Sequence, residues 1–184
     1  MDEATIEAAR RGERAAQARL LSALQDVWYR YALSQLRDPD RAADATQETG
    51  LRFLKQIGGF RGESQLTTWS LGIALNVVRE MKRRRFPELS HPEAATAPRV
   101  AGAGEREAPH PARAVERMEA VEVLKQTLQQ LPDRQREAIV LRFFEDLSVE
   151  QAAAAMGCAA GTVKATVHQA LRALKQRMSG IAEG

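Results

Sequence analysis

The chain has 184 residues, a formal net charge of +3, 44% apolar residues and only 5% aromatic residues. This length suffices for one ordinary domain or two small ones, and the prevalence of Ala and Leu favours helices over strands. A single cysteine excludes an internal disulfide and suits a reducing cytoplasm, and no apolar run approaches the roughly 18 residues of a membrane span.

The first part of the chain, residues 1–86, is predicted to form four helices, at roughly 3–11, 15–36, 39–57 and 66–85. The charged start of the first helix lacks the apolar segment of a secretion signal. Pro39 is expected to open the third helix, because its fixed φ suits the first helical position. Gly58 and Gly59 are expected to end that helix.

One face of the helix at 39–57 carries four polar residues. They are Asp44, Gln47, Glu48 and Arg52, at spacings of three and four. This pattern fits a solvated face in which Glu48 pairs with Arg52. It equally fits a docking face for a protein partner, and periodicity alone leaves both interpretations open.

The loop FRGESQ precedes the fourth helix and contains Phe60, Arg61 and Ser64. An aromatic ring beside an arginine and small polar groups can hold an unstacked nucleic-acid base. A phenylalanine at the base of a loop can also be a core anchor, and the sequence leaves this alternative open.

The helix at 66–85 combines a wide apolar face with a polar, basic stripe formed by Asn76, Arg79 and Arg83. Asparagine offers a donor and an acceptor to a base edge, and arginine suits phosphate groups. The helix ends in a basic cluster at 82–85, where cations also stabilise a solvated helix terminus. The stripe and the cluster therefore fit either a nucleic-acid surface or an ordinary amphipathic helix.

Residues 87–112 are predicted to form a flexible linker. Five of the seven prolines fall in this segment, and no apolar periodicity survives in it. The segment therefore separates the first helical unit from a second one at 113–184.

The second unit is also predicted to contain four helices. One of them begins at Pro132-Asp133. The next begins at Ser148, which forms a capping box with Gln151, and ends at Gly157, which supplies a positive φ. A short turn leads into the last helix. Two helices joined in this way form a helix-turn-helix, whose second helix lies in a DNA major groove.

The last helix separates apolar from polar side chains. Its apolar side is predicted to comprise Val163, Val167, Ala170, Leu171, Leu174 and Met178. The other side carries polar and basic groups and no acid before Glu183. This charge pattern favours contact with DNA over a plain helical hairpin.

No catalytic motif is found: the sequence has no Gly-rich phosphate loop, no nucleophile elbow and no paired-histidine helix. One cysteine and three distant histidines offer no spacing for a zinc site. We therefore predict a protein that is not an enzyme and that uses no metal or cofactor. Two other classes remain open, a stand-alone DNA-binding regulator and an all-helical adaptor that binds a protein without DNA.

Four segments of the chain together resemble one family. They are DATQETGLRFLKQI, FRGESQLTTWSLGIALN, LQQLPDRQREAIVLRFFEDLSVEQAAAAMG and GTVKATVHQALRALKQRM. In order and spacing they are similar to bacterial RNA polymerase sigma factors of the extracytoplasmic-function (ECF) group of the sigma-70 family. The resemblance implies an all-α fold with a sigma-2 domain at 1–86 and a helix-turn-helix sigma-4 domain at 113–184, joined by the flexible linker at 87–112.

The resemblance implies an alternative-type sigma factor that binds core RNA polymerase and directs promoter-specific transcription initiation. Its partners would be core polymerase and promoter DNA in the cytoplasm. An anti-sigma factor is a further candidate partner. It assigns core-polymerase binding to Asp44, Gln47, Glu48 and Arg52. It assigns the minus-10 element to Phe60, Arg61, Ser64, Asn76 and Arg79, with Arg83 and Arg84 on phosphates. It assigns the minus-35 element to Thr162, Lys164, Ala165, Thr166, His168 and Gln169, with Arg172 on a phosphate.

Some residues depart from the family pattern. Gly50 stands where a bulky apolar residue is usual, and a glycine inside a helix costs about 1 kcal/mol relative to alanine. The helix is therefore expected either to be weaker or to be packed closely by a neighbour at this point. The last helix is expected to begin at Ala159 or Ala160 without a capping side chain, and it lacks an arginine usual in the family, which predicts a less cationic minus-35 contact.

The predicted linker leaves the arrangement of the two domains open. They can stay extended, or they can pack into a compact form that hides the DNA-binding faces. The resemblance implies that an anti-sigma partner often holds such a compact form in this family.

Overall fold

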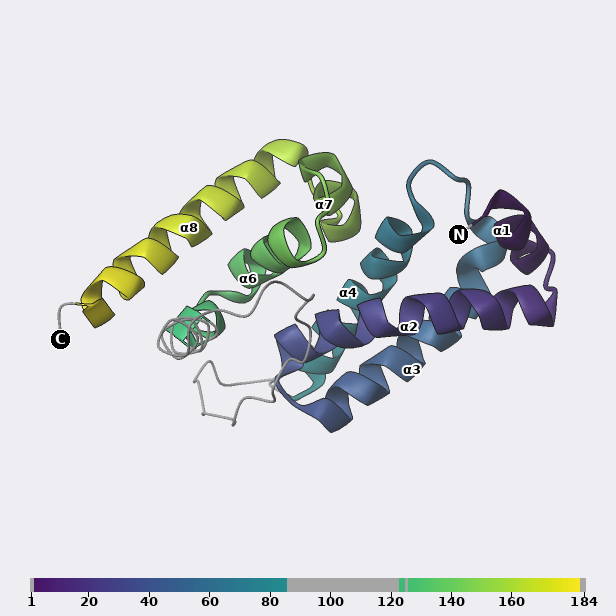
Figure 1. Cartoon of the computed structure of the whole chain (residues 1–184), viewed down its shortest axis with the longest axis horizontal. Coiled ribbons are helices and arrows are strands. Elements are labelled where there is room, and N and C mark those ends of the chain that lie inside the picture. Colours follow the sequence, from purple (N-terminus) through teal and green to yellow (C-terminus); the bar gives the residue numbers. More distant parts are fainter. Residues whose placement is uncertain (1, 86–122, 125, 183–184) are drawn as a thin grey trace, which may run out of the picture.

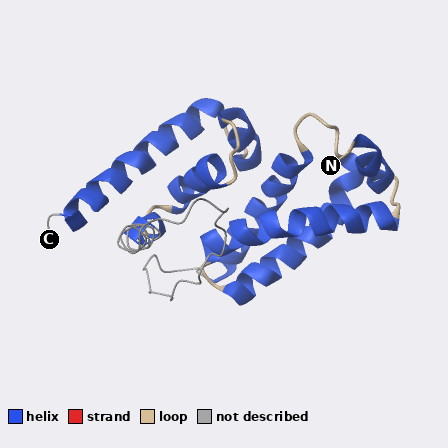
Figure 2. Cartoon of the chain, in the orientation of Figure 1, coloured by secondary structure: helices blue, strands red, loops and turns tan. Residues whose placement is uncertain are grey.

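A computed structural model describes residues 2–85, 123–124 and 126–182, and within these ranges every regular element is a helix (Figures 1 and 2). This confirms the all-α fold. The predicted linker at 87–112 lies outside the described residues, as do the first positions of the second unit.

The helices of the first unit begin and end within one residue of the predicted positions. They are α1 (Glu3–Arg10), α2 (Arg14–Leu36), α3 (Pro39–Gln56), the 3-10 turn η1 (Ile57–Gly59) and α4 (Leu66–Arg85). Asp38 caps α3, because its carboxylate accepts the backbone N–H groups of Asp40 and Arg41 at 3.0 and 3.1 Å. Helix α2 ends at Leu36 as predicted, but the left-handed conformation of its C-cap Arg37 was not predicted: a φ of 60° is rare for a residue with a side chain.

The second unit contains α6 (Asp133–Ile139), the π-helical turn η2 (Val140–Phe144), α7 (Val149–Met156) and α8 (Ala160–Ala182). The predicted capping box of α7 is confirmed. The Ser148 hydroxyl accepts the Gln151 N–H at 3.1 Å, and the Gln151 side chain accepts the Ser148 N–H at 2.7 Å. Gly157 ends α7 with a φ of 65°, as predicted.

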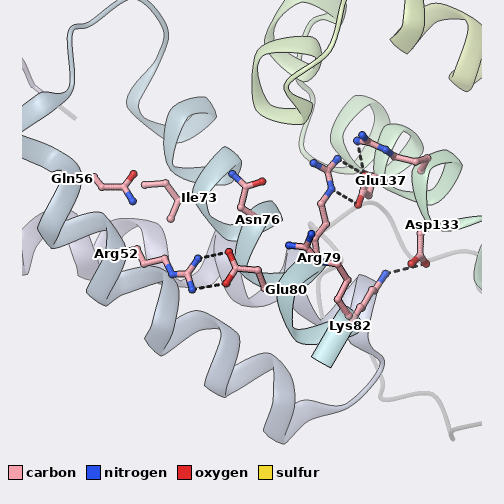
Figure 3. Close-up of a pocket in the computed structure, with 11 residues that line it drawn as sticks. Arg52, Gln56, Ile73, Asn76, Arg79, Glu80, Lys82, Asp133 and Glu137 are labelled. Carbon is pink, nitrogen blue, oxygen red and sulfur yellow. Dashed lines mark hydrogen bonds and ion pairs between the residues drawn. The ribbon is translucent and has the colours of Figure 1, made fainter. Parts of the chain in front are cut away.

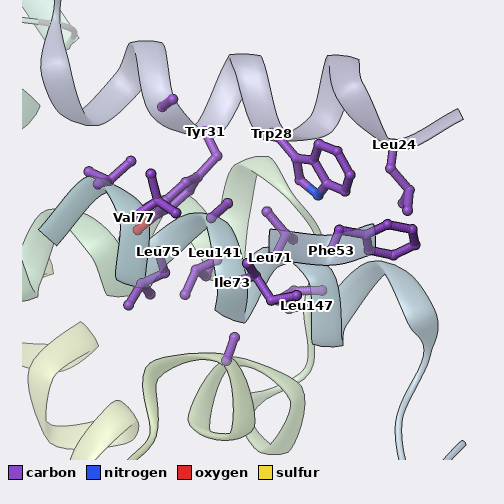
Figure 4. Close-up of a cluster of buried hydrophobic side chains, with 14 of the residues drawn as sticks. Leu24, Trp28, Tyr31, Phe53, Leu71, Ile73, Leu75, Val77, Leu141 and Leu147 are labelled. Carbon is purple, nitrogen blue, oxygen red and sulfur yellow. The ribbon is translucent and has the colours of Figure 1, made fainter. Parts of the chain in front are cut away.

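The core of the first unit is built around aromatic side chains, and Figure 4 shows two of them, Trp28 of α2 and Phe53 of α3. Ring centroids lie 5.5 Å apart for Trp28 and Phe53, 5.8 Å apart for Phe53 and Trp69, and 5.2 Å apart for Phe60 and Trp69. The Trp28 indole N–H donates to the Ser70 hydroxyl at 3.0 Å, which satisfies a buried donor. This core fixes α4 against α2 and α3.

Helix α4 packs against both units. One side of α4 contacts α2 and α3, and another side contacts α7. Figure 1 shows α4 between the α6–α7 pair and the α2–α3 pair. Leu141 and Leu147 of the second unit belong to the same buried cluster as Leu71 and Leu75 of α4 (Figure 4). Because α4 is covered on two sides, the two units share one apolar core and adopt a compact arrangement.

Gly50 lies where α3 meets α2. A Cβ atom placed on it would be 3.5 Å from Leu21 Cδ2 and 3.8 Å from the Trp28 ring. These are ordinary van der Waals distances, so α2 packs closely at this point and still leaves room for a methyl group.

We expect Gly50→Ala to raise the free energy of unfolding by about 0.5–1 kcal/mol, because alanine has less conformational freedom to lose in a helix. The measurement is a denaturant titration followed by circular dichroism. Gly157→Ala is the matched control: its positive φ predicts destabilisation by about 1 kcal/mol. Destabilisation by Gly50→Ala would show that α2 cannot accommodate the methyl group.

Candidate polymerase and nucleic-acid interfaces

The polar face predicted on α3 is present and faces solvent. Asp44 and Gln47 are exposed, and Glu48 is half-buried. Leu51 lies on the same face, because it follows Glu48 by three residues and Gln47 by four. Its exposed fraction is 56%. Sequence reasoning missed Leu51, although the same helical spacing would have identified it. An exposed leucine amid polar groups is typical of a protein-binding face.

Arg52 points away from this face and bridges two helices (Figure 3). Its guanidinium donates to both carboxylate oxygens of Glu80 on α4 at 2.8 and 2.7 Å, and to Glu48 at 2.7 Å. The hydrogen bonds from Arg52 lower the pKa of the Glu80 carboxyl below its ordinary value. The predicted Glu48–Arg52 pair is therefore present, but Arg52 mainly joins α3 to α4.

The loop before α4 divides into a buried and an exposed part. Phe60 is buried against Trp69, so the structure supports the core-anchor alternative and we no longer assign Phe60 to DNA. Arg61 is largely exposed, with Glu63 at 4.0 Å, and Ser64 is half-buried. The signal for Phe60 was ambiguous, because an aromatic residue after a helix fits either role.

The polar stripe of α4 is present, but its members differ in accessibility. Asn76, Arg83 and Arg84 are exposed. Arg79 is partly buried, and its guanidinium donates to both oxygens of Glu137 on α6 at 3.0 and 2.7 Å (Figure 3).

Asn76 and Arg79 line a groove beside α4. Its volume is about 540 Å³, and it is lined by residues of α3, α4 and α6. An adjoining hollow of about 460 Å³ shares Asn76 and Arg79 and extends to the end of α7. The groove is polar: its cations outnumber its three carboxylates, Glu80, Asp133 and Glu137, which suits a hydrogen-bonding or anionic partner.

The outward face of α8 is open along its length. The exposed residues are Thr162, Lys164, Ala165, His168, Gln169 and Arg172. Thr166 is half-buried, and its hydroxyl donates to the Thr162 carbonyl at 2.7 Å. Val163, Ala170 and Leu174 are buried as predicted. The prediction for Leu171 was wrong: 46% of it is exposed, since it lies at the margin of the packed stripe. Met178 lies outside the side chains that the structure describes.

Among the described residues, no group of three or more His, Cys, Asp or Glu side chains is arranged to hold a metal ion. The same part of the chain contains no helix long and apolar enough to cross a membrane.

Models and members of one protein family match this chain. The model for sigma-70 region 2 matches residues 20–86, and the model for sigma-70 region 4 matches residues 122–174. The chain is 32% identical to the RNA polymerase sigma-H factor of Pseudomonas aeruginosa over 96% of its own length and 93% of that protein. The chain is an ECF sigma factor of the sigma-70 family. It is also 34% identical to the ECF RNA polymerase sigma factor EcfG of Rhodopseudomonas palustris, over 76% of this chain and 72% of that one.

Solved structures of sigma factors have the same fold. The sigma factor RpoE from Bartonella quintana, crystallised with the anti-sigma factor NepR, matches with a TM-score of 0.67 at 25% identity, over 88% of this chain and 96% of that one. CnrH, solved in complex with the cytosolic domain of CnrY, matches with a TM-score of 0.69 at 21% identity, over 97% of each chain. The region 2 match lies within the first unit of this sigma factor and the region 4 match within the second, so the two units contain its sigma-2 and sigma-4 domains, respectively. Together they direct promoter-specific transcription initiation with RNA polymerase.

We expect the Arg52–Glu80 bridge to stabilise the sigma-2 domain by about 1 kcal/mol, since both side chains are only partly exposed and the contact is bidentate. The measurement is the coupling free energy of a cycle of Arg52→Gln, Glu80→Gln and the double variant.

The pH dependence gives a second readout of this bridge. The Glu80 pKa is lowered by folding, so its contribution is present above the ordinary value of 4.5 and disappears as the pH falls through the lowered pKa. The stabilities of the wild type and Glu80→Gln therefore converge in acid. A coupling energy of zero at neutral pH would contradict this role for Arg52.

Proposed function

We propose that this sigma factor divides its work among three helices. The exposed face of α3 binds core polymerase, α4 and the loop before it bind the opened minus-10 strand, and α8 reads the minus-35 element. The observation that carries this proposal is that Leu51, Asn76 and Lys164, one on each of these helices, are exposed on a fold shared with other sigma factors. In this proposal the protein supplies binding energy and no catalytic chemistry of its own. It acts in the cytoplasm, where polymerase and promoters are found.

The α3 face supports the first assignment. Leu51 offers an apolar anchor, and Asp44, Gln47 and Glu48 surround it with polar groups. An apolar centre with a polar rim is the common anatomy of a protein interface. Arg52 contributes indirectly, by holding Glu48 and by joining this face to α4.

The groove beside α4 supports the second assignment. Asn76 presents an amide that can both donate to and accept from a base edge, and it lies at the groove wall (Figure 3). Arg61, Arg83 and Arg84 are exposed cations, and Ser64 lies at the adjoining hollow. This set can hold unstacked bases and nearby phosphates, whose binding offsets the few kcal/mol lost on unstacking each base.

The outward face of α8 supports the third assignment. Its first turns present Thr162, Lys164 and Ala165, followed by His168 and Gln169. In a helix-turn-helix these turns of the second helix meet base edges in the major groove. Arg172 lies further along the helix, where a phosphate contact is expected, and Thr166 lies between the two sets.

An anti-sigma factor is the further partner that we propose. RpoE from Bartonella quintana was solved bound to one, and this chain has the same fold over most of its length.

We expect Asn76→Ala to reduce open-complex formation severalfold while leaving the affinity for core polymerase unchanged, because the exposed Asn76 side chain supports no packing in the fold. Leu51→Asp is expected to have the opposite effect, weakening core binding by tenfold or more, since a charge replaces the apolar anchor. The measurements are permanganate footprinting of the holoenzyme on its promoter and titration of labelled core polymerase with each variant.

Both variants lie on exposed surfaces, and circular dichroism verifies that each is folded. Loss of core binding in Asn76→Ala, or normal core binding in Leu51→Asp, would overturn this assignment of faces.

A further inference from the structure

Two adjoining hollows lie where the sigma-2 and sigma-4 domains meet. The groove beside α4 has a volume of about 540 Å³, and the hollow next to α7 has a volume of about 460 Å³. Asn76 of α4 and Arg134 of α6 line both of them. Small-molecule sites in proteins occupy roughly 300–1,000 Å³. Each hollow is therefore large enough for one part of a small ligand.

The groove beside α4 is the cationic part of this junction. Some of its cations are held by carboxylates, as Arg79 is by both oxygens of Glu137. Arg83 and Arg134 also line the groove, and both are exposed. Arg134 lies 3.6 Å from the Glu137 carboxylate, so most of its five N–H groups are available to a ligand. Two exposed arginines in one groove suit a chain of phosphate groups.

The hollow next to α7 is less charged and has apolar walls. Trp69 and Ile73 of α4 and Met156 of α7 line it. Trp69 is half-buried: its indole packs against Phe53 and Phe60 in the core and also borders the hollow. Aromatic and apolar walls of this kind suit the flat face of a nucleobase.

Polar groups at the same walls suit the edge of a base. Asn76 and Gln56 line both hollows, and their exposed amides each offer a donor and an acceptor. Figure 3 shows these two amides on either side of Ile73. Thr68 borders the hollow next to α7; it is fully buried, and its hydroxyl has no hydrogen-bond partner among the described residues. Because an unpaired buried hydroxyl costs free energy, a polar ligand atom beside it would be stabilising.

We infer that this junction binds an adenine nucleotide with two or more phosphates. The base occupies the hollow next to α7, and the phosphates occupy the groove beside α4. Asparagine and glutamine amides pair with the N6 and N7 edge of adenine, which favours this base. Arg83 of sigma-2 and Arg134 of sigma-4 bind the phosphates. The site requires neither DNA nor polymerase, so the inference does not depend on the role proposed for α4.

A nucleotide at this site would contact both domains at once. The walls come from α3 and α4 on one side and from α6 and α7 on the other. A ligand that binds only the folded, packed arrangement stabilises it in proportion to the logarithm of the ligand concentration. The stability of the sigma factor would thus respond to the nucleotide level.

Isothermal titration calorimetry of the full chain tests the inference. The probes are ADP, adenosine and inorganic pyrophosphate, each at up to about 1 mM, the upper end of common substrate levels. We expect ADP to bind at least about tenfold more tightly than either of the others, because only ADP reaches both hollows and each part contributes hydrogen bonds.

Three outcomes of this titration would overturn the inference. The first is no binding of ADP. The second is pyrophosphate binding as tightly as ADP, which would indicate an adventitious ion only. The third is adenosine binding as tightly as ADP, which would exclude the phosphate contacts.

Two variants locate the site. Arg134→Gln is expected to weaken ADP binding about tenfold, because it removes a charged donor from the phosphates. Gln56→Ala is expected to weaken ADP binding and to leave pyrophosphate binding unchanged, because it removes an amide from the base. Arg19→Gln is the matched control, since Arg19 is exposed on α2 and lines neither hollow. Unchanged ADP affinity in Arg134→Gln, or an equal loss in Arg19→Gln, would contradict the site.

Failure of this inference is distinguishable from failure of the proposed function. Permanganate footprinting of the holoenzyme needs no free nucleotide, so it reports promoter opening separately. Normal promoter opening without ADP binding would overturn only the nucleotide site. ADP binding without promoter opening would overturn only the proposed function.

Discussion

The packing of α4 between two neighbours is the constraint on which the rest of the structure depends. One side of the helix completes the aromatic core of the sigma-2 domain, and another side meets α7 of the sigma-4 domain. Only a narrow polar stripe remains for any other partner. Because the same helix carries the residues proposed to bind the minus-10 strand, intramolecular packing and promoter binding compete for it.

The charges at this interface follow from that competition. A nucleic-acid surface must carry cations, and cations buried against an apolar partner need counterions. Glu137 and Asp133 supply them within the same chain. Tyr31 lies fully buried at the same place, and burial followed by the nearby Glu137 charge raises the pKa of its hydroxyl well above the ordinary value. The interface between the domains thus contains charged side chains, each paired with an opposite charge of the same chain.

The sequence predicted the local structure well, because helix ends are determined by neighbouring residues. Asp38, Ser148 and Gly157 each act through bonds or dihedral angles within a few residues. The left-handed conformation of Arg37 was not predicted, because no residue type marks it in the sequence as a glycine would. Phe60 was misassigned because an aromatic residue in a loop fits either a base contact or a core anchor. Leu171 was misassigned because it lies at the margin of the packed stripe of α8.

The contact between the domains could not be predicted, although α4 carried a sign of it. Leu71, Ile73, Leu75, Val77 and Val78 are all buried, and no single helical face can hold five such positions within eight residues. This density indicated a second apolar neighbour without identifying it. The neighbour depends on long-range pairings such as Arg79 with Glu137, 58 residues apart, which periodicity does not report.

The distance between the two domains in solution tests the account most directly. Spin labels at Gln25 on α2 and Gln176 on α8, both exposed and outside every proposed interface, report that distance in a Cys158→Ser background. The shared packing of α4 predicts one narrow, short distance in the free sigma factor. A broad distribution of distances in the free protein would contradict it.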